Sequence, residues 1–331
     1  MDPLTHTVTG LFLSRAGLNR WTPRATPILL LAANAPDVDI VALSGGSLSY
    51  LHWHRHLTHS LVAMPVMALL TVAVVKLAGR KPIPWFAASV AALIGVASHL
   101  LLDWTNAYGI RLLLPFSDRW LRLDLLSLFD PWILGVALLA IVGPIVARLV
   151  GSEISSGKEK PRYQGRGFAW FALLFMVFYS YGRSVLRDRT VVMLDSRVYQ
   201  GVAASRVAAF PSANPWRWHG LAETPDFIAI ADVSPGEEFD PLRATVFHKP
   251  DPDPAIDVAW RTHTFQEFLR FSQFPLWRVS PAPDMENAKL VEVLDMRFGN
   301  PLAPGFMASA VVDSRLSVVR EDFQWGLPRT R

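Results

Sequence analysis

Long apolar runs occupy about the first 182 residues of the chain, and the remainder carries shorter runs between polar turns. A helix that crosses a membrane needs roughly 20 mostly apolar residues, because the hydrocarbon core is about 30 Å thick. Four runs reach or approach this length: residues 60–79, 83–102, 132–150 and 168–185. A fifth run, residues 26–35, is too short to span, so we expect a short embedded helix there.

The chain after Arg183 has the pattern of a small β domain. Turn-forming residues separate short apolar or alternating runs at residues 227–233, 244–248, 289–298 and 308–320. Residues 267–271 have the pattern of a short helix. We therefore predict a mostly α multi-pass membrane domain over residues 1–190, with about four transmembrane helices and the embedded helix. A soluble C-terminal domain of α+β or mainly-β class follows over residues 191–331.

Composition also indicates a membrane protein. Hydrophobic residues make up 51% of the chain and charged residues 18%, whereas a soluble domain carries about 25% charged residues. The net charge is +4 and the basic residues are scattered, so we expect no nucleic-acid binding. Because the sequence has no cysteine, any metal ion must bind histidine, aspartate or glutamate. The N-terminus does not have the pattern of a cleaved signal peptide.

Two short basic connections between the predicted spans set the expected orientation. Their basic residues are Lys76, Arg80 and Lys81 in the first, and Arg148, Lys158, Lys160, Arg162 and Arg166 in the second. With four spans both connections lie on one face, which the positive-inside rule assigns to the cytoplasm. We therefore expect the C-terminal domain on the non-cytoplasmic side. Arg183, Arg187 and Arg189 fall on that side and weaken the bias.

Ionisable residues collect at span ends that share one membrane face. Four histidines precede the first predicted span, at positions 52, 54, 56 and 59, and His99 and Asp103 close the second. His99 and Asp103 are four residues apart, so on a helix both project from one side and can bind one ion. Asp37 and Asp39 follow the short helix, and His6 precedes another apolar run.

Each of these groups also has a purely structural interpretation. The two aspartates could be solvated residues at a helix end, the histidine cluster could contact lipid headgroups, and His99 could be bonded to a backbone carbonyl. Ionisable residues at a membrane edge are costly to bury and commonly mark functional sites. Their conjunction on one face therefore favours a site that binds a divalent metal ion.

Ordered motifs that contain these residues resemble the YdjM-like (DUF457) family of inner-membrane metal-dependent hydrolases, also described as LexA-binding. The motifs are Asp2-Pro3-Leu4-Thr5-His6-Thr7, Ala35-Pro36-Asp37-Val38-Asp39, His54-Arg55, Leu57-Thr58-His59-Ser60, Ser98-His99-Leu100-Leu101-Leu102-Asp103-Trp104, Leu113-Leu114-Pro115-Phe116-Ser117-Asp118-Arg119-Trp120 and Asp130-Pro131. The resemblance covers residues 1 to about 200. It implies a bacterial-type inner membrane protein that passes the membrane several times.

The resemblance also implies which residues form the site. The expected metal ligands are His6, Asp37, Asp39, His54, His59, His99 and Asp103. Helical spacing alone favours His52, His56 and His59 as one face, whereas the family pattern selects His54 and His59. The family pattern also allows Thr58 to cap the first span. His56 departs from the family pattern and is either a bystander or an extra ligand.

The resemblance implies a membrane-bound metal-dependent hydrolase, and this donor set suits such a site. Nitrogen and carboxylate ligands suit zinc, with manganese and iron as alternatives. We expect Asp37 and Asp103 at the catalytic centre, and Arg55, or else Arg111 or Arg119, on an anionic substrate. The family's likeness to zinc-dependent phospholipases implies phosphoesters or related esters, derived from lipid or envelope.

Two other functions remain open at this point. The first is a non-enzymatic membrane anchor or regulatory protein with a structural metal site, and the second is a transporter that uses Asp37, His99 and Asp103 as a relay. Expected partners are membrane lipids, and a protein bound through the C-terminal domain.

Overall fold

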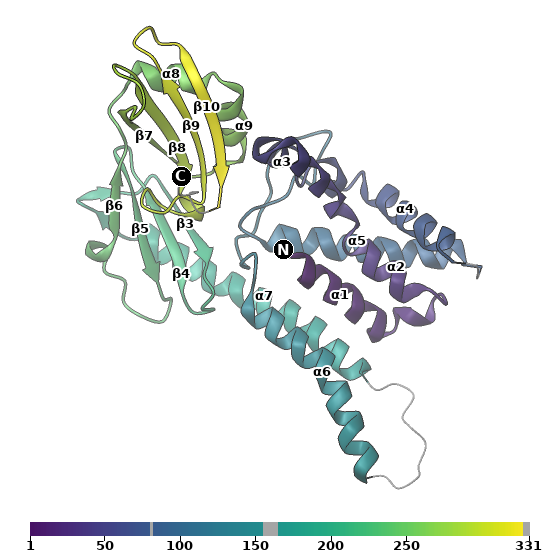
Figure 1. Ribbon diagram of the computed structural model, residues 1–331. Helices are drawn as coiled ribbons and strands as arrows, with labels where there is room; N and C mark the ends of the chain where they lie inside the picture. Colours follow the sequence, from purple (N-terminus) through teal and green to yellow (C-terminus); the bar gives the residue numbers. More distant parts are fainter. Residues whose placement is uncertain (80–81, 155–164, 327–331) are drawn as a thin grey trace. The chain divides into compact units, whose positions relative to one another are not determined.

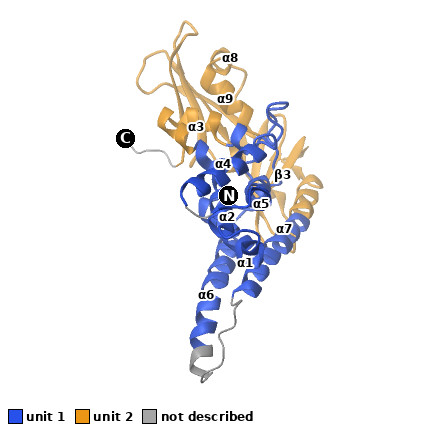
Figure 2. Cartoon of the chain, turned by 90° about the vertical axis from the view of Figure 1, so that its right-hand side faces the viewer, with its two compact units in different colours: residues 1–39, 55–186, 211–215 blue, residues 40–54, 187–210, 216–331 orange. Residues whose placement is uncertain are grey.

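A computed structural model describes residues 1–79, 82–154 and 165–326. Arg80, Lys81, Lys158, Lys160 and Arg162, used above for orientation, lie outside these residues. The chain forms two compact units, drawn in blue and orange in Figure 2. The first contains residues 1–39, 55–186 and 211–215, and the second contains residues 40–54, 187–210 and 216–331. The first half of the chain therefore contributes a segment to the second unit.

The N-terminal half is helical (Figure 1). Its α-helices are α1 (Pro3–Ala16), α2 (Ala25–Ala32), α3 (Ser47–Trp53), α4 (Met64–Leu77), α5 (Trp85–Thr105), α6 (Pro131–Ile154) and α7 (Arg166–Asp195), with 3-10 turns η1 (Leu18–Arg20), η2 (Ala35–Gly45) and η3 (Leu57–His59). The predicted run at residues 26–35 thus forms α2 and the start of η2. Helix α7 continues from the first unit into the second at residue 187.

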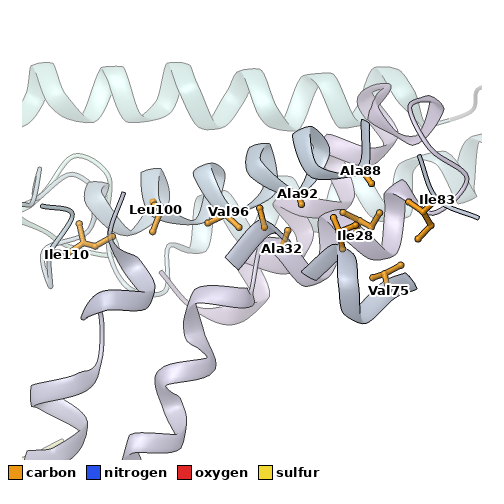
Figure 3. Close-up of a cluster of buried hydrophobic side chains, with 11 residues drawn as sticks. Ile28, Ala32, Val75, Ile83, Ala88, Ala92, Val96, Leu100 and Ile110 are labelled. Carbon is orange, nitrogen blue, oxygen red and sulfur yellow. The ribbon is translucent and has the colours of Figure 1, made fainter. Parts of the chain in front are cut away.

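Small residues allow α1, α2 and α5 to pack closely. A side-chain carbon at Gly95 of α5 would lie 2.7 Å from the Ala32 Cβ, and one at Gly10 of α1 would lie 2.6 Å from the Leu29 carbonyl oxygen. The buried core between α2, α4 and α5 is shown in Figure 3, where Ala88, Ala92 and Val96 line the inner face of α5. This close packing brings the ends of α1, α2 and α5 together, which is where the candidate site lies.

Helices α6 and α7 pack against α1 through alanines and leave apolar outer faces. Ala137 and Ala140 of α6 meet Ala169 and Ala172 of α7, and Phe12 of α1 completes the cluster. Large apolar side chains on the outer faces of α6 and α7 remain exposed: Leu138, Leu139, Val142, Val177 and Phe178. Such a continuous apolar surface fits contact with lipid.

Within the described residues, three helices have the length and composition to cross a membrane: α5, α6 and α7 over their apolar windows. The number rises to five if each of two bent helix pairs forms one span. The first predicted span begins later than expected, because α4 starts at Met64 with Pro65 in its first turn. Its 14 residues extend about 21 Å, so α4 alone is shorter than the hydrocarbon core.

The C-terminal half contains the antiparallel sheets that the sequence predicts. One sheet has the order β3-β4-β5-β6, the other β10-β9-β8-β7, and β1 and β2 form a hairpin. The strands are β1 (Val198–Tyr199), β2 (Val202–Ala203), β3 (Arg206–Pro211), β4 (Trp218–Glu223), β5 (Phe227–Val233), β6 (Thr245–His248), β7 (Pro275–Pro281), β8 (Lys289–Asp295), β9 (Phe306–Val312) and β10 (Val318–Trp325). The remaining elements are α8 (Pro254–Trp260), α9 (His263–Phe271), η4 (Pro241–Arg243) and η5 (Met296–Phe298).

Some β elements differ from the predicted runs. The run at residues 308–320 is split between β9 and β10, because Asp313 accepts hydrogen bonds from the nitrogens of Arg315 and Ser317 and closes a turn. The predicted helix at residues 267–271 is the second half of α9, whose Phe265, Phe268 and Phe271 are buried. The second half is therefore sheet-rich with two short helices in the described residues.

Helix α3 belongs to this sheet-rich unit. The Ser47 hydroxyl donates to the Phe323 carbonyl of β10 over 2.8 Å. The Nδ1 atom of His52 lies 2.6 Å from a carboxylate oxygen of Glu267 on α9, and Tyr50 packs against Trp325 at 4.9 Å between ring centroids. Residues 40–54 are thus held by partners more than 200 positions away in sequence.

Candidate metal centre

Three elements of the first unit bring together four side chains that could bind a metal ion. Asp37 comes from η2, His59 from η3, and His99 and Asp103 from consecutive turns of α5. The side chains of His59, His99 and Asp103 are fully buried, while 23% of the Asp37 side chain is exposed. The predicted pairing of His99 and Asp103 across one helical turn is present, with His99 Nε2 3.4 Å from Asp103 Oδ2.

The spacing of the four donor atoms matches a tetrahedral site. The Nε2 atoms of His59 and His99 are 3.2 Å apart. Asp37 Oδ1 lies 3.4 Å from the first and 3.6 Å from the second, and Asp103 Oδ2 lies 3.4 Å from each. A tetrahedral zinc ion with bonds of about 2.0–2.1 Å holds its donors about 3.3–3.4 Å apart. These five distances between donor atoms agree with that spacing, so the cluster could hold a metal ion without movement of the four side chains.

Hydrogen bonds orient both histidines for metal binding. Nδ1 of His99 lies 2.7 Å from the carbonyl oxygen of Ala33, so this nitrogen carries the proton and donates it. The Thr58 hydroxyl donates its proton to Asp39 Oδ2, which leaves His59 Nδ1 to donate to Thr58 or to Asp39, at 3.0 and 3.1 Å. In singly protonated rings each Nε2 then presents a lone pair to the centre, as in metal sites whose ligands have fixed tautomers.

Asp39 supports the centre from outside it. Its Oδ2 atom accepts hydrogen bonds from the Arg55 backbone nitrogen at 2.8 Å and from Thr58, and it faces His59 Nδ1. The structure thus brings Asp39 next to the cluster, bonded to the far side of a ligand. The expected helix cap by Thr58 is wrong, since Ser60 accepts from the Ala63 nitrogen before α4 and Thr58 bonds Asp39.

The two carboxylate oxygens of Asp103 have different surroundings. Oδ1 accepts a 2.8 Å hydrogen bond from Arg55 Nη2 and another bond from the Met1 nitrogen. Within the described residues, Oδ2 has no hydrogen-bond partner although it is buried. A buried carboxylate oxygen without a partner is costly, and a bound cation at the cluster would satisfy it.

His6 lies beside the cluster on α1. Its ring stacks on His99 at 3.8 Å between centroids, and Nε2 is 3.4 Å from Asp103 Oδ1. Neither ring nitrogen makes a hydrogen bond within the described part of the chain. Burial, with help from His99, lowers the pKa of His6 to about 3, so the imidazole is neutral and can act as a ligand.

The three arginines considered for substrate binding have different surroundings. Arg55 is 2% exposed, and its guanidinium binds Asp103 and the Gly109 carbonyl oxygen and lies 4.9 Å from the Tyr108 ring centroid. Arg111 is buried over the ring of Trp120, and Arg119 is exposed. Arg55 therefore holds the carboxylate of a donor residue.

The other histidines of the motif region are not among the four residues of this cluster. His54 belongs to the second unit, where its ring stacks on Tyr50 at 4.4 Å. His52 pairs with Glu267 in that unit, and His56 precedes η3 in the first unit. The ligand role predicted for His54 stays a prediction.

Sequence reasoning missed the groups that position the ligands. The Ala33 carbonyl has no side-chain signal that could have identified it, and the pairing of Arg55 with Asp103 joins residues 48 positions apart. Asp130 of the last motif accepts hydrogen bonds from the nitrogens of Trp132 and Ile133 and caps α6.

A family model and a curated protein each match part of the chain. Residues 1–190 match the family described as YdjM inner membrane protein. The chain is also similar to YfhP, an uncharacterized protein of Bacillus subtilis (strain 168), with 32% identity over 141 residues. That match covers 40% of this chain and 43% of YfhP, so it spans less than half of either. No solved structure matches the chain.

Proposed function

The chain belongs to the YdjM inner membrane protein family, and we propose that it is a membrane-bound metal-dependent hydrolase. One observation carries the proposal: four donor atoms of Asp37, His59, His99 and Asp103 converge at near-tetrahedral spacing. The donor set, two imidazoles and two carboxylates without thiolate, suits zinc, with manganese and iron as alternatives.

The partial exposure of Asp37 supports a catalytic rather than a closed site. Three donors are fully buried, and Asp37 is the one that solvent reaches. A divalent ion held here would supply an activated water near neutral pH and polarise the scissile bond. Catalysis requires a coordination position that the protein leaves open, so Asp37, at the exposed side of the cluster, would yield its position to that water and accept a proton from it. Asp103 is kept in position by Arg55, and His59 by Asp39.

The position of the site supports an ester substrate from the membrane. His99 and Asp103 lie in the last two turns of α5, a candidate span, so the centre lies at one end of that helix. A site near the membrane surface can reach a phosphoester or related ester of lipid or envelope material. The positive-inside bias further supports the non-cytoplasmic side for this end and for the C-terminal domain.

A combined assay of metal content and hydrolysis tests the proposal. Detergent-purified wild type, His99→Ala and the control His219→Ala are analysed for bound metal and for cleavage of 4-nitrophenyl phosphate, bis(4-nitrophenyl) phosphate and phospholipid vesicles. We expect bound metal and cleavage in wild type and control, with both lost in His99→Ala. Absence of metal from the wild type after growth with zinc, manganese and iron would refute the proposal.

The alternative is a non-enzymatic membrane anchor or regulatory protein with a structural metal ion. The full burial of His59, His99 and Asp103 favours it, since structural sites are closed. The same assay separates the two functions. The structural role would be supported if the wild type binds metal, His99→Ala loses it, and neither protein cleaves any of the substrates.

A further inference from the structure

A small pocket lies between the ends of three helices of the first unit, away from the metal centre. It has a volume of about 160 Å³ and is formed at the C-terminal end of α1, along α6 and at the start of α7. Four of its lining residues are arginines: Arg15, Arg20, Arg148 and Arg166. Arg15 lies nine residues after His6 on α1, which corresponds to about 14 Å along the helix axis.

Specific contacts build this pocket. Arg166 Nε and Trp170 Nε1 both donate to the Ala16 carbonyl oxygen, at 2.9 and 3.0 Å, and so attach the start of α7 to the end of α1. Gly165 has a φ of +110°, and a side-chain carbon there would lie 3.4 Å from Pro144 of α6. These contacts fix the helix ends, so the pocket belongs to the folded unit.

The charges around the pocket favour an anion. The described residues that line it include four guanidinium groups and no acidic side chain. The first turn of α7 adds the positive end of a long helix, where backbone N–H groups bind anions. Within the described residues, the Arg15 side chain makes no hydrogen bond or ion pair. An anion in the pocket would bind this guanidinium and reduce the repulsion between like charges.

The volume of the pocket and its position at the ends of apolar helices favour a phosphate group as the ligand. A volume of about 160 Å³ has room for on the order of ten water molecules, which exceeds the need of one phosphate. Arginine matches phosphate oxygens with paired hydrogen bonds. The pocket adjoins the ends of apolar helices, and Trp170, 47% exposed, lies one turn along α7, as tryptophans do at membrane interfaces.

We propose that this arginine pocket binds the phosphate group of an anionic ligand, either an anionic phospholipid headgroup or a free phosphate. Arg148 and Arg166 lie at the helix ends that the positive-inside rule assigns to the cytoplasm, where anionic lipids concentrate. The site is separate from the metal centre, so the proposal does not depend on hydrolytic activity.

Thermal unfolding of the full chain in a neutral detergent tests this assignment. The probes are dioctanoyl phosphatidylglycerol, dioctanoyl phosphatidylcholine and inorganic phosphate at constant ionic strength, and the variants are Arg15→Gln and Arg15→Lys. We expect an anionic probe to raise the Tm of the wild type, with about fivefold more probe needed for half of the effect in Arg15→Gln. Arg15→Lys, which keeps the charge, should lie between the two.

The probes also distinguish the source of the phosphate. A response to phosphatidylglycerol alone would assign a lipid headgroup, and a response to inorganic phosphate would assign a soluble anion. Arg243→Gln removes an exposed arginine of the second unit and should respond like the wild type. The proposal is overturned if no anionic probe shifts the wild type, or if Arg15→Gln responds to every probe as the wild type does.

Discussion

His59 and His99 face each other through their Nε2 atoms at 3.2 Å. When His99 keeps one proton on Nδ1, bonded to the Ala33 carbonyl oxygen, and His59 keeps one on Nδ1, beside Asp39, each Nε2 presents a lone pair to the other. Two lone pairs at this distance repel unless a cation lies between them. The carboxylate oxygens of Asp37 and Asp103 that adjoin both nitrogens add to the negative potential at this point.

Replacement of a central ligand should therefore empty the site. In His99→Ala and Asp103→Asn, bound metal should fall to background, because each change removes one of the four converging donors. Elemental analysis of the purified protein measures this. His219→Ala in the second unit, whose ring lies 3.6 Å from Asp232, is the matched control. Wild-type metal content in both site variants would disprove the centre.

Asp39→Asn should weaken metal binding without abolishing it. Asp39 orients His59 from outside the cluster, and loss of such partners costs about 10–100-fold in metal affinity. Competition with a chromophoric chelator measures the change. An affinity equal to that of the wild type would show that Asp39 does not orient His59, whereas complete loss of metal would make it a direct ligand.

Arg55→Met should destabilise the protein through Asp103. The pair is buried, with 3% and 0% of the two side chains exposed, and removal of one partner of a buried ion pair costs about 3–5 kcal/mol. Thermal unfolding in detergent should show a clear fall in Tm. Arg278→Met is the control, because Arg278 is 41% exposed and 3.7 Å from Glu292; such surface pairs contribute about 0–1 kcal/mol. Equal effects of the two changes would contradict the role assigned to Arg55.

Removal of metal by a chelator should lower the Tm of the wild type. A ligand that binds only the folded state adds about 2.7 kcal/mol of stability at a concentration 100 times its Kd. Addition of zinc after dialysis should restore the original Tm. His99→Ala should show no response to either treatment, and a similar response in that variant would place the stabilising ion elsewhere.

The second unit should have its own pH dependence through Glu223. Burial acts to raise the pKa of this carboxyl, but hydrogen bonds from Lys249 and Arg206 hold it below the ordinary value of 4.5. A lowered folded-state pKa gives stability that is complete above pH 4.5 and is lost as the pH falls through the folded value. Glu223→Gln should cost about 1 kcal/mol at pH 7 and much less in acid. A cost that does not change with pH would exclude this linkage.

The sequence could predict the parts of the site that depend on local spacing. His99 and Asp103 are one helical turn apart, so any helix through them places both side chains on one face. The family resemblance adds Asp37 and His59, which lie in 3-10 turns where periodicity gives no signal. The partners that orient the ligands were not predictable, because a backbone carbonyl or an ion pair between distant residues depends on how the helices pack.

In the fold, too, local patterns were predictable from the sequence and long-range contacts were not. The antiparallel strands follow from alternating runs and turn residues, and β5 has the predicted bounds. The start of α4 and the split of β9 from β10 depend on Pro65 and Asp313, single residues within otherwise apolar or alternating runs. The membership of α3 in the second unit depends on contacts such as His52 with Glu267, 215 positions apart, and no local pattern encodes them.

The membership of α3 in the sheet-rich unit imposes an order on biosynthesis. Residues 40–54 leave the ribosome long before β10 and α9 exist, and chains generally fold from the N-terminus as they are made. The segment between Asp39 and Arg55 therefore cannot pack against its partners in the sheet-rich unit until the last strands have been synthesised. Helices α5, α6 and α7 can be inserted during this interval. Docking of α3 is consequently one of the last steps in the maturation of the protein.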